Sequence, residues 1–506
     1  MRGIKSILLG VVLFILINPF SSNALARELD EKRISEERLK LAEDYFNEQM
    51  QNNNIIGGVF GITYQDKLIR SQGYGKIDKK TNQMPNEKTV YSIASVTKSF
   101  TASAIYQLQD EGLLHLDEPI RTYIPWFRFK QEKLSDQITL RHLLTHSAGG
   151  IGSFQTDGLI FAERKARDSL EDYVRLFKTI EVQQKPGQSG NYCNGCYDIL
   201  GLVIEYVSGL SYYDYIQQNI LDPLQMKETV FGTKLNQFAD SRLAKEYTWF
   251  FTQKVHINRS FEAFGSAQDP DGGLYSTIED LSKFLSAQLG FTEHPLMNSQ
   301  SIADSRTDHV STELFDALYT ASGFETKQLH QNKIFYKTGD GVGSASAILF
   351  IPEQDLGVTL LLGEFHPEIQ LTIVEGISAI LLGYEPDFNS APFTFGKTLG
   401  ILSIALLLAG IVFLGFLIRR FRKKSFYAKS LSRSILSWMG YGAAAAAFWL
   451  LLLKVRPTSI GFYGYPYDLA IGILMITGAL SLWFIYFTLV ISLKKYNKEK
   501  SKNITA

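Results

Sequence analysis

A serine and a lysine three positions apart, Ser95 and Lys98, are the residues whose types and spacing could do covalent chemistry. They stand where a loop enters a segment with apolar residues at helical spacing, which ends at Gly112. One helical turn separates them, so both side chains leave the same face near the helix start. A neutral amine there could take the serine proton, and the N–H groups of the helix N-terminus could stabilise an oxyanion.

The Ser-x-x-Lys pattern is weak on its own. It occurs a second time at Ser492 and Lys495, at the polar end of an apolar stretch where we expect no chemistry. An ordinary helix start with a solvated lysine has the same pattern. Partners elsewhere in the chain must therefore distinguish a nucleophile at Ser95 from a simple helix start.

Two further patterns follow in order, Tyr192-Cys193-Asn194 and Lys337-Thr338-Gly339. Together with Ser-x-x-Lys they resemble the serine β-lactamase and penicillin-binding protein superfamily. The Tyr-x-Asn element is similar to that of the class C β-lactamase, D,D-peptidase and esterase branch. Segments 139–150, 201–209 and 272–277 also look like family segments, so the resemblance covers about residues 35–385.

The resemblance implies three catalytic residues. Ser95 is the nucleophile that accepts the acyl group. Lys98, desolvated and close to a second cation at Lys337, should have a lowered pKa and accept the serine proton. Tyr192 is the partner base or proton relay, because two nearby ammonium groups would favour its phenolate.

The resemblance also implies a substrate-binding set. Asn194 would orient Lys98 and hydrogen-bond an amide of the substrate. Lys337, Thr338 and Gly339 would form a strand edge that pairs with the substrate, with Gly339 allowing close approach to the backbone. The N–H groups of Ser95 and Asp340 would form the oxyanion hole.

Two positions depart from the family pattern. Asp340 places a carboxylate where a small residue is commoner, and it would oppose an oxyanion unless its side chain points away. Cys193 lies inside the middle motif, with Cys196 one turn later. At this spacing a local disulfide and two unpaired cysteines are both compatible with the sequence.

The order of strand-like and helix-like segments predicts an α+β fold. Two strand-like segments, 57–64 and 67–74, precede a mostly helical middle, and three more follow it at 333–337, 344–351 and 356–362. We expect one antiparallel sheet assembled from both ends, flanked by helices, with the middle inserted as a helical subdomain. The predicted helices include 33–50, 139–146, 198–208, 278–289 and 367–382.

Charge and histidine spacing exclude two classes of partner. The 506 residues include 51 basic and 51 acidic ones, so there is no electrostatic case for nucleic-acid binding. His142 and His146 are spaced like zinc ligands, but the zinc-protease pattern needs a glutamate where Leu143 stands, and no third ligand is near. We therefore expect a structural histidine pair, with no metal or other cofactor.

The first residues predict an export signal. A basic start is followed by an apolar run from 7 to 17 and by the small-x-small site Ala24-Leu25-Ala26. The run is short for a membrane span. We expect a signal peptide of residues 1–26, cleaved after Ala26, and an extracytoplasmic hydrolase domain of residues 27–390.

Residues 391–506 predict a membrane region. Three long, nearly uncharged apolar stretches, about 399–418, 435–453 and 469–493, could each cross a bilayer. The basic loop 419–424 and the lysine-rich tail would be cytoplasmic by the positive-inside rule. Both signals agree on a multi-pass protein of the cell membrane whose catalytic domain faces outward.

Three functions fit these features. The first is a membrane-anchored serine hydrolase that forms an acyl-enzyme with D-Ala-D-Ala-type peptides, β-lactams or small esters, so its partners are a small molecule or cell-wall peptide and the bilayer. The second is a slow or non-turning-over penicillin-binding or sensor protein whose helices signal or recruit partners. The third is a membrane protein with a vestigial outer domain, for which spans without intramembrane carboxylate, lysine or arginine offer little support.

Overall fold

The computed structural model describes residues 34–386 except 163–168, 251–252, 258–264, 294, 308, 312–318 and 367–368, with a few helical positions between 401 and 481. The predicted signal peptide and almost all of the three predicted spans therefore lie outside the described residues. Within the described part of the chain, no helix is both long and apolar enough to cross a membrane.

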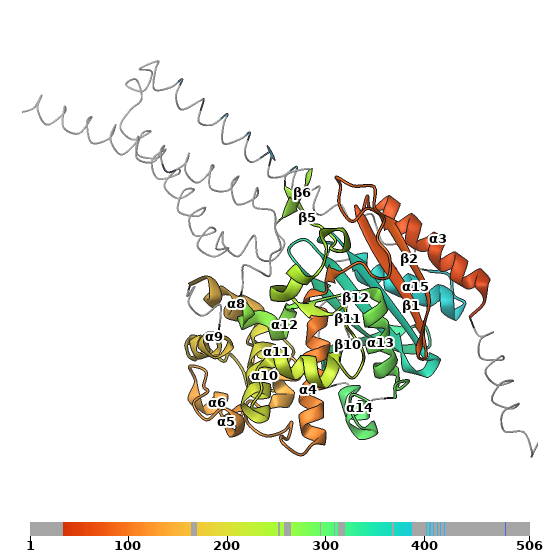
Figure 1. The fold of residues 1–506 in the computed structure, drawn as a ribbon. Coiled ribbons are helices and arrows are strands. Elements are labelled where there is room, and N and C mark those ends of the chain that lie inside the picture. Colours follow the sequence, from red (N-terminus) through yellow and green to blue (C-terminus); the bar gives the residue numbers. More distant parts are fainter. Residues whose placement is uncertain are drawn as a thin grey trace, which may run out of the picture.

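An antiparallel sheet forms the centre of the fold (Figure 1). Its strands are β1 (Gly57–Tyr64), β2 (Lys67–Gly75), β8 (Val310–Ser311), β9 (Tyr319–Ala321), β10 (Phe324–Leu329), β11 (Asn332–Asp340), β12 (Ala345–Ile351) and β13 (Leu356–Leu362). Their order across the described sheet is β2-β1-β13-β12-β11-β10-β9-β8. Since β1 pairs directly with β13, the prediction of one sheet assembled from both ends is confirmed. The short edge strands β8, β9 and β10 were not expected.

Two smaller sheets accompany the central one. A three-stranded sheet contains β3 (Tyr91–Ser92), β4 (Val230–Phe231) and β7 (Leu274–Ser276), in the order β3-β7-β4 among the described residues. The hairpin of β5 (Glu246–Phe250) and β6 (Gln253–Ile257) forms the other. Because β3 immediately precedes the Ser95 turn, its pairing with β7 fixes where that turn begins.

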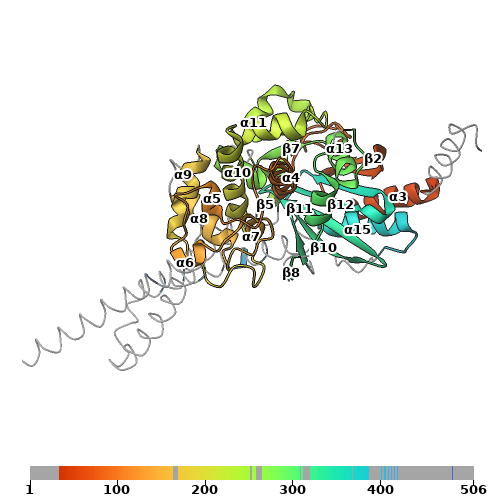
Figure 2. The same cartoon turned by 90° about the horizontal axis from the view of Figure 1, so that it is seen from below.

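Helices cover both faces of the sheet. They are α3 (Glu36–Asn52), α4 (Thr97–Asp110), α5 (Ile120–Tyr123), α6 (Glu132–Ser135), α7 (Leu140–Leu144), α8 (Ser153–Ala162), α9 (Leu170–Arg175), α10 (Asn194–Ser208), α11 (Tyr212–Ile216), α12 (Asp269–Gly272), α13 (Ile278–Leu289), α14 (Ser299–Ser305) and α15 (Ile369–Leu382). Helices α3 and α15 pack together on one face, and α13 packs on the other (Figure 1). Figure 2 shows α4 nearly end-on between the sheet and α10 of the helical subdomain.

Capping residues explain several helix boundaries. The Thr139 side chain accepts a hydrogen bond from the backbone of His142, and the His142 ring in turn bonds the Thr139 backbone. Helix α10 ends at Gly209 with φ of 74°, a left-handed conformation that glycine adopts without strain. Helix α13 has the boundaries that the sequence predicted, from the Thr277 cap to Gly290.

The sheet separates two hydrophobic cores, and β11 contributes side chains to both. Ile334 and Tyr336 pack in the core beneath α3 and α15, whereas Phe335 packs in the core around α4. Because side chains alternate along a strand, Lys337 lies on the α4 side. Asp340 lies on the α15 side.

Candidate active site

Ser95 lies in a tight turn of 3-10 helix, Ala94–Val96, directly before α4. The backbone N–H of Ile93 donates to the carbonyl of Leu274 at 3.0 Å, which ties the turn to β7. Ala94 has φ of 43°, a conformation that costs a residue with a Cβ about 1–3 kcal/mol and persists only where the surroundings impose it. Ser95 is half-buried, so its hydroxyl is accessible at the junction of the sheet and α4.

Lys98 reaches Ser95 from one turn along α4. Its side chain is fully buried, and Nζ donates to Ser95 Oγ at 3.1 Å and to the carbonyl of Asp271 at 2.6 Å. This is the juxtaposition that the Ser-x-x-Lys spacing predicted. The distance is within the range for direct proton transfer between the two side chains.

Tyr192 joins this pair from a distant part of the sequence. Its ring lies 5.2 Å from Lys98 Nζ and 4.7 Å from Lys337 Nζ, measured to the ring centroid. The His146 ring packs against it at 4.5 Å between centroids. The structure therefore brings together the serine, both amines and the phenol that the three motifs supply.

Lys337 has a carboxylate partner of its own. Its Nζ donates to Glu325 Oε1 on β10 at 2.6 Å, and both side chains are buried. Burial alone would lower the pKa of Lys337, but Glu325 and Tyr192 outweigh it, so the pKa is raised and Lys337 remains an ammonium. The sequence predicted Lys337 as a second cation close to Lys98 and did not predict Glu325, which pairs with Lys337 and neutralises it.

Asn194 has a different partner from the one expected. Its Nδ2 donates to Asp157 Oδ2 on α8 at 2.8 Å, and its Oδ1 has no hydrogen-bond partner in the described part of the chain. The contacts of Lys98 are to Ser95 and Asp271, so Asn194 is not the residue that orients this lysine. Its free Oδ1 can accept a hydrogen bond from a substrate amide, as the motif implies.

Gly339 allows the backbone that carries Ser95 to approach β11. A Cβ at this position would lie 2.2 Å from the carbonyl oxygen of Ile93 and 3.1 Å from Ser95 N. Ser346 Oγ, on the paired strand, donates to the same Ile93 carbonyl at 2.7 Å. The glycine is therefore required for contact within the protein, where the sequence had indicated approach of a substrate.

We expect Gly339→Ala to reduce turnover by a factor of about 100 to 1,000, the usual cost of one lost oxyanion donor. The added methyl group must displace Ile93 and with it Ser95 N. Gly357→Ala on β13 is the matched control, since its Cβ would meet the side chains of Leu285, at 3.0 Å, and Thr63, at 3.5 Å, and no backbone that carries Ser95. Steady-state kinetics check this, and equal losses in both variants would contradict it.

One edge of β11 is free beside Ser95. Strand β10 pairs with β11 only as far as Tyr336, whereas β12 pairs through Asp340. Among the described residues, 337–340 therefore have a strand on one side only, which suits pairing with an extended substrate. Thr338 is half-buried here, and alternation places its side chain on the opposite face of β11 from Lys337.

The Asp340 carboxylate points away from the oxyanion position. Its Oδ1 accepts from Gln370 Nε2 on α15 at 2.8 Å, behind the sheet. Burial raises the pKa of Asp340 to about 6, with Gln370 and Lys337 opposing the shift. The unfavourable carboxylate anticipated at this position is thus absent from the site, while the Asp340 N–H stays on the strand.

Cys193 and Cys196 form a disulfide at the start of α10. The question that the spacing left open is therefore answered for the structure: the thiols are joined. The Cys193 N–H donates to His146 Nδ1 at 3.2 Å. Burial, Lys337 and Lys98 hold the pKa of His146 well below its usual value, so the ring is neutral with its proton on Nε2.

The sequence did not predict that four residues contact the candidate site residues: Asp157, His146, Asp271 and Glu325. His146 had been read as one of a structural pair, yet His142 caps α7 while His146 packs on Tyr192. Asp271 belongs to none of the three motifs. No periodicity marks Glu325, because its pairing depends on the register between β10 and β11.

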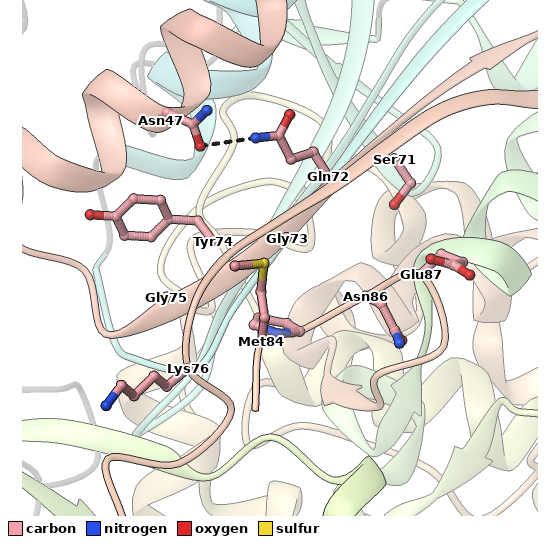
Figure 3. A pocket seen from close by; sticks show the side chains of 11 residues that line it. Asn47, Ser71, Gln72, Gly73, Tyr74, Gly75, Lys76, Met84, Asn86 and Glu87 are labelled. Atoms are coloured by element: carbon pink, nitrogen blue, oxygen red, sulfur yellow. Dashed lines mark hydrogen bonds between the residues drawn. The ribbon is translucent and has the colours of Figure 1, made fainter. Parts of the chain in front are cut away.

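A separate hollow lies along the outer edge of β2 (Figure 3). Its volume is about 620 Å³, and it is lined by β2, by Asn47 of α3 and by the segment from Met84 to Glu87. Gln72 bonds Asn47 at its upper side. None of the predicted site residues lines this hollow.

Buried carboxyls behind Lys98 give the protein a pH-dependent stability. Burial first, then the charge of Asp271, raises the pKa of Asp269 from 3.8 to about 8. A carboxyl whose folded pKa is raised binds its proton more tightly when folded. Stability therefore falls as pH rises from about 4 to 8, by at most about 1.4 kcal/mol per pH unit for each such group.

We expect Asp269→Asn to flatten this dependence. The amide cannot ionise, so the variant should lose less stability between pH 5 and pH 8 than the wild type, by several degrees in Tm. Thermal unfolding at the two pH values measures it. An unchanged difference in Tm would show that Asp269 does not titrate as described.

Similarity to known proteins identifies the family of this chain. Residues 42–371 match the family model described as Beta-lactamase, a range that contains all three motifs. The chain belongs to the Beta-lactamase family. It therefore belongs to the serine β-lactamase and penicillin-binding protein superfamily, whose members bind small-molecule or peptide substrates, and its α+β fold is of the β-lactamase/transpeptidase type.

Individual relatives of this Beta-lactamase family member are distant. Protein flp of Staphylococcus aureus (strain MW2) is 26% identical over 407 residues, covering 77% of each protein. The Beta-lactamase of Escherichia coli (strain K12) is 24% identical over 355 residues, covering 63% of this chain and 86% of that protein. The structure of the octameric penicillin-binding protein homologue from Pyrococcus abyssi aligns with a TM-score of 0.62 at 25% identity, covering 72% of this chain and 81% of that one.

Proposed function

We propose that this protein is a serine hydrolase of the class C-like branch, acting through an acyl-enzyme on D-Ala-D-Ala-type peptides, β-lactams or small esters. The observation that carries the proposal is the 3.1 Å contact between Ser95 Oγ and the fully buried Lys98 Nζ. Tyr192 beside both amines supports it. A solvated lysine at an ordinary helix start would have none of these contacts.

Acylation uses these groups in order. Lys98, with Tyr192 as relay, takes the proton of Ser95 Oγ as that oxygen attacks the substrate carbonyl. The N–H groups of Ser95 and Asp340 stabilise the oxyanion, and the strand edge that carries Lys337 holds the substrate. The proton then passes to the leaving group, and water attacks the ester on Ser95 to complete the reaction.

We also propose that the hydrolase is held outside the cytoplasm by the C-terminal membrane region. The signal-like residues 1–26 and the three apolar stretches after residue 390 support this placement. The Cys193–Cys196 disulfide suits an oxidising compartment. Reporter fusions after residues 390 and 425 test it: the first should report outside, the second inside, and the reverse pattern would contradict it.

A two-part experiment tests the activity with the full-length protein in detergent. Fluorescent penicillin and a fluorophosphonate label the protein, with Ser95→Ala as control, and release of each label is followed. Nitrocefin, p-nitrophenyl esters and D-Ala-D-Ala peptides are then assayed for turnover. Rapid release and turnover support a hydrolase, a persistent adduct would instead indicate a penicillin-binding or sensor role, and no adduct with either probe would overturn the nucleophile assignment.

A further inference from the structure

The segment 270–274 is fastened to the first turns of α4. Three hydrogen bonds make the attachment: Thr101 Oγ1 to Pro270 O at 2.6 Å, Lys98 Nζ to Asp271 O at 2.6 Å, and Leu274 N to Thr97 Oγ1 at 3.2 Å. All three use the backbone of the segment. The position of Asp271 beside Lys98 is therefore fixed without help from its carboxylate.

The Asp271 carboxylate nevertheless faces the catalytic amine. Its Oδ2 lies 3.7 Å from Lys98 Nζ, and the two side chains are 8% and 0% exposed. At this depth water screens the interaction poorly, so a carboxylate there acts strongly on the charge of the amine. Neither the backbone attachment nor the acylation steps described above require this carboxylate.

Further buried carboxyls interact with Asp271, two on other helices and one on the same helix. Asp157 of α8 and Asp198 of α10 both interact electrostatically with it and with Lys98. Asp269 interacts with Asp271. Tyr173 and Tyr212 also interact electrostatically with Asp198 and Asp271. Burial raises the pKa of both hydroxyls, so they add no charge near neutral pH.

These carboxyls differ in the hydrogen bonds and opposite charges that offset their burial. Burial, and then Asp271, raise the pKa of Asp157 to about 7 and that of Asp198 well above its usual value. Both oxygens of Asp198 lack hydrogen-bond partners in the described part of the chain. Burial also raises the pKa of Asp271, and the charge of Lys98 opposes that shift. Asp271 is thus the carboxyl of this group that forms an ion pair with Lys98, at 3.7 Å.

On the opposite side of Lys98 the other charged group is already neutralised. Lys337 is paired with Glu325, and His146 is neutral. The rings of Tyr192 and Tyr197 lie 5.2 and 5.7 Å from Lys98 Nζ. Among the described residues, the carboxylate in direct contact with Lys98 is therefore that of Asp271.

We propose that Asp271 is a positioning residue whose carboxylate stabilises the Lys98 ammonium formed during acylation, and so sets the pH range in which Lys98 can act as the base. The inference rests on the proposed function of Ser95 and Lys98. In the step concerned, the Oγ–H bond breaks, its proton joins the Lys98 amine, Oγ bonds the carbonyl carbon, and the carbonyl electron pair moves to the oxyanion. Asp271 exchanges no proton in this step.

The experiment measures the rate of fluorophosphonate labelling of the full-length protein from pH 5 to pH 9, in wild type, Asp271→Asn and Asp269→Asn. Without the carboxylate the Lys98 ammonium is less stable, so its neutral form persists to lower pH. In Asp271→Asn the pH at which the labelling rate falls off on the acidic side, the acidic limb of the pH–rate profile, should move to lower pH by about one unit or more. The maximal labelling rate should fall about tenfold, because a less basic amine is a weaker proton acceptor. Asp269→Asn, a buried acid of the same helix without contact to Lys98, should leave the limb in place.

Three results would overturn the inference: an Asp271→Asn profile superimposable on wild type, an equal shift in Asp269→Asn, or full recovery of the wild-type limb in Asp271→Ser. Asp271→Ser also replaces Asp271→Asn if the latter does not fold, since the backbone attachment needs no side chain. Loss of wild-type labelling altogether would instead contradict the proposed function. If the wild type is labelled but the variants keep the wild-type pH–rate profile, the result contradicts only the role of Asp271.

Discussion

Ser95→Ala is expected to reduce turnover of any substrate of this protein by a factor of about 10⁴ or more, because the acyl-accepting oxygen is removed. Binding should survive, since the β11 edge and Asn194 remain. The loss is measured from initial rates at saturating substrate, expressed per amount of folded protein.

Ser92→Ala is the matched control for this variant. Ser92 lies three residues earlier on β3, and its hydroxyl is buried without a hydrogen-bond partner in the described part of the chain. We expect turnover within about twofold of wild type, as for a substitution that breaks no native contact. A Ser95→Ala protein with residual turnover close to that of Ser92→Ala would mean that another residue carries the chemistry.

Tyr192→Phe is expected to lower kcat by a factor of about 100 to 10,000, the usual contribution of a positioned general acid or base. The phenylalanine ring can keep its place between Lys98 and Lys337 and its contact with His146, so only the hydroxyl is lost. Thermal stability should change little. Steady-state kinetics together with thermal unfolding separate the two effects.

Tyr197→Phe is expected to lower stability and to leave kcat nearly unchanged, the opposite of Tyr192→Phe. This ring also lies near Lys98 and His146, but its hydroxyl donates to the carbonyl of Leu144 at 2.8 Å, deep in the helical subdomain. Removing it should cost about 1 kcal/mol of stability and leave kcat nearly unchanged. If both variants lost activity equally, proximity of a tyrosine hydroxyl to Lys98 would not define the proton relay.

Periodicity and local turn chemistry made much of the fold predictable. The hairpin of β1 and β2, helix α13 and the capped helix α7 all follow from patterns within fewer than twenty residues. The closing of the sheet by β1 and β13 followed from strand-like segments at both ends of the domain. The strands β8, β9 and β10 at one side of the sheet were not predicted, because they are short and their apolar and polar residues alternate only weakly.

The proximity of Ser95, Lys98 and Tyr192 was predictable for a different reason, since each belongs to a short motif with a characteristic order. The acidic partners were not. Glu325 reaches Lys337 only because of the strand register that sets it opposite Tyr336. Asp271 reaches Lys98 only because Thr97 and Thr101 fasten its segment to α4. Such contacts depend on tertiary packing, which spacing along the chain does not encode.

Localising the covalent adduct tests the central claim most directly. The full-length protein is treated with fluorophosphonate or penicillin and digested with trypsin, and the peptide of residues 89–98 is fragmented in a mass spectrometer. This peptide contains both Ser92 and Ser95, so the fragments assign the added mass to one serine. We predict that the mass lies on Ser95 and is absent from Ser95→Ala; an adduct on Ser92 or elsewhere in the chain, or one that persists in Ser95→Ala, would contradict the account.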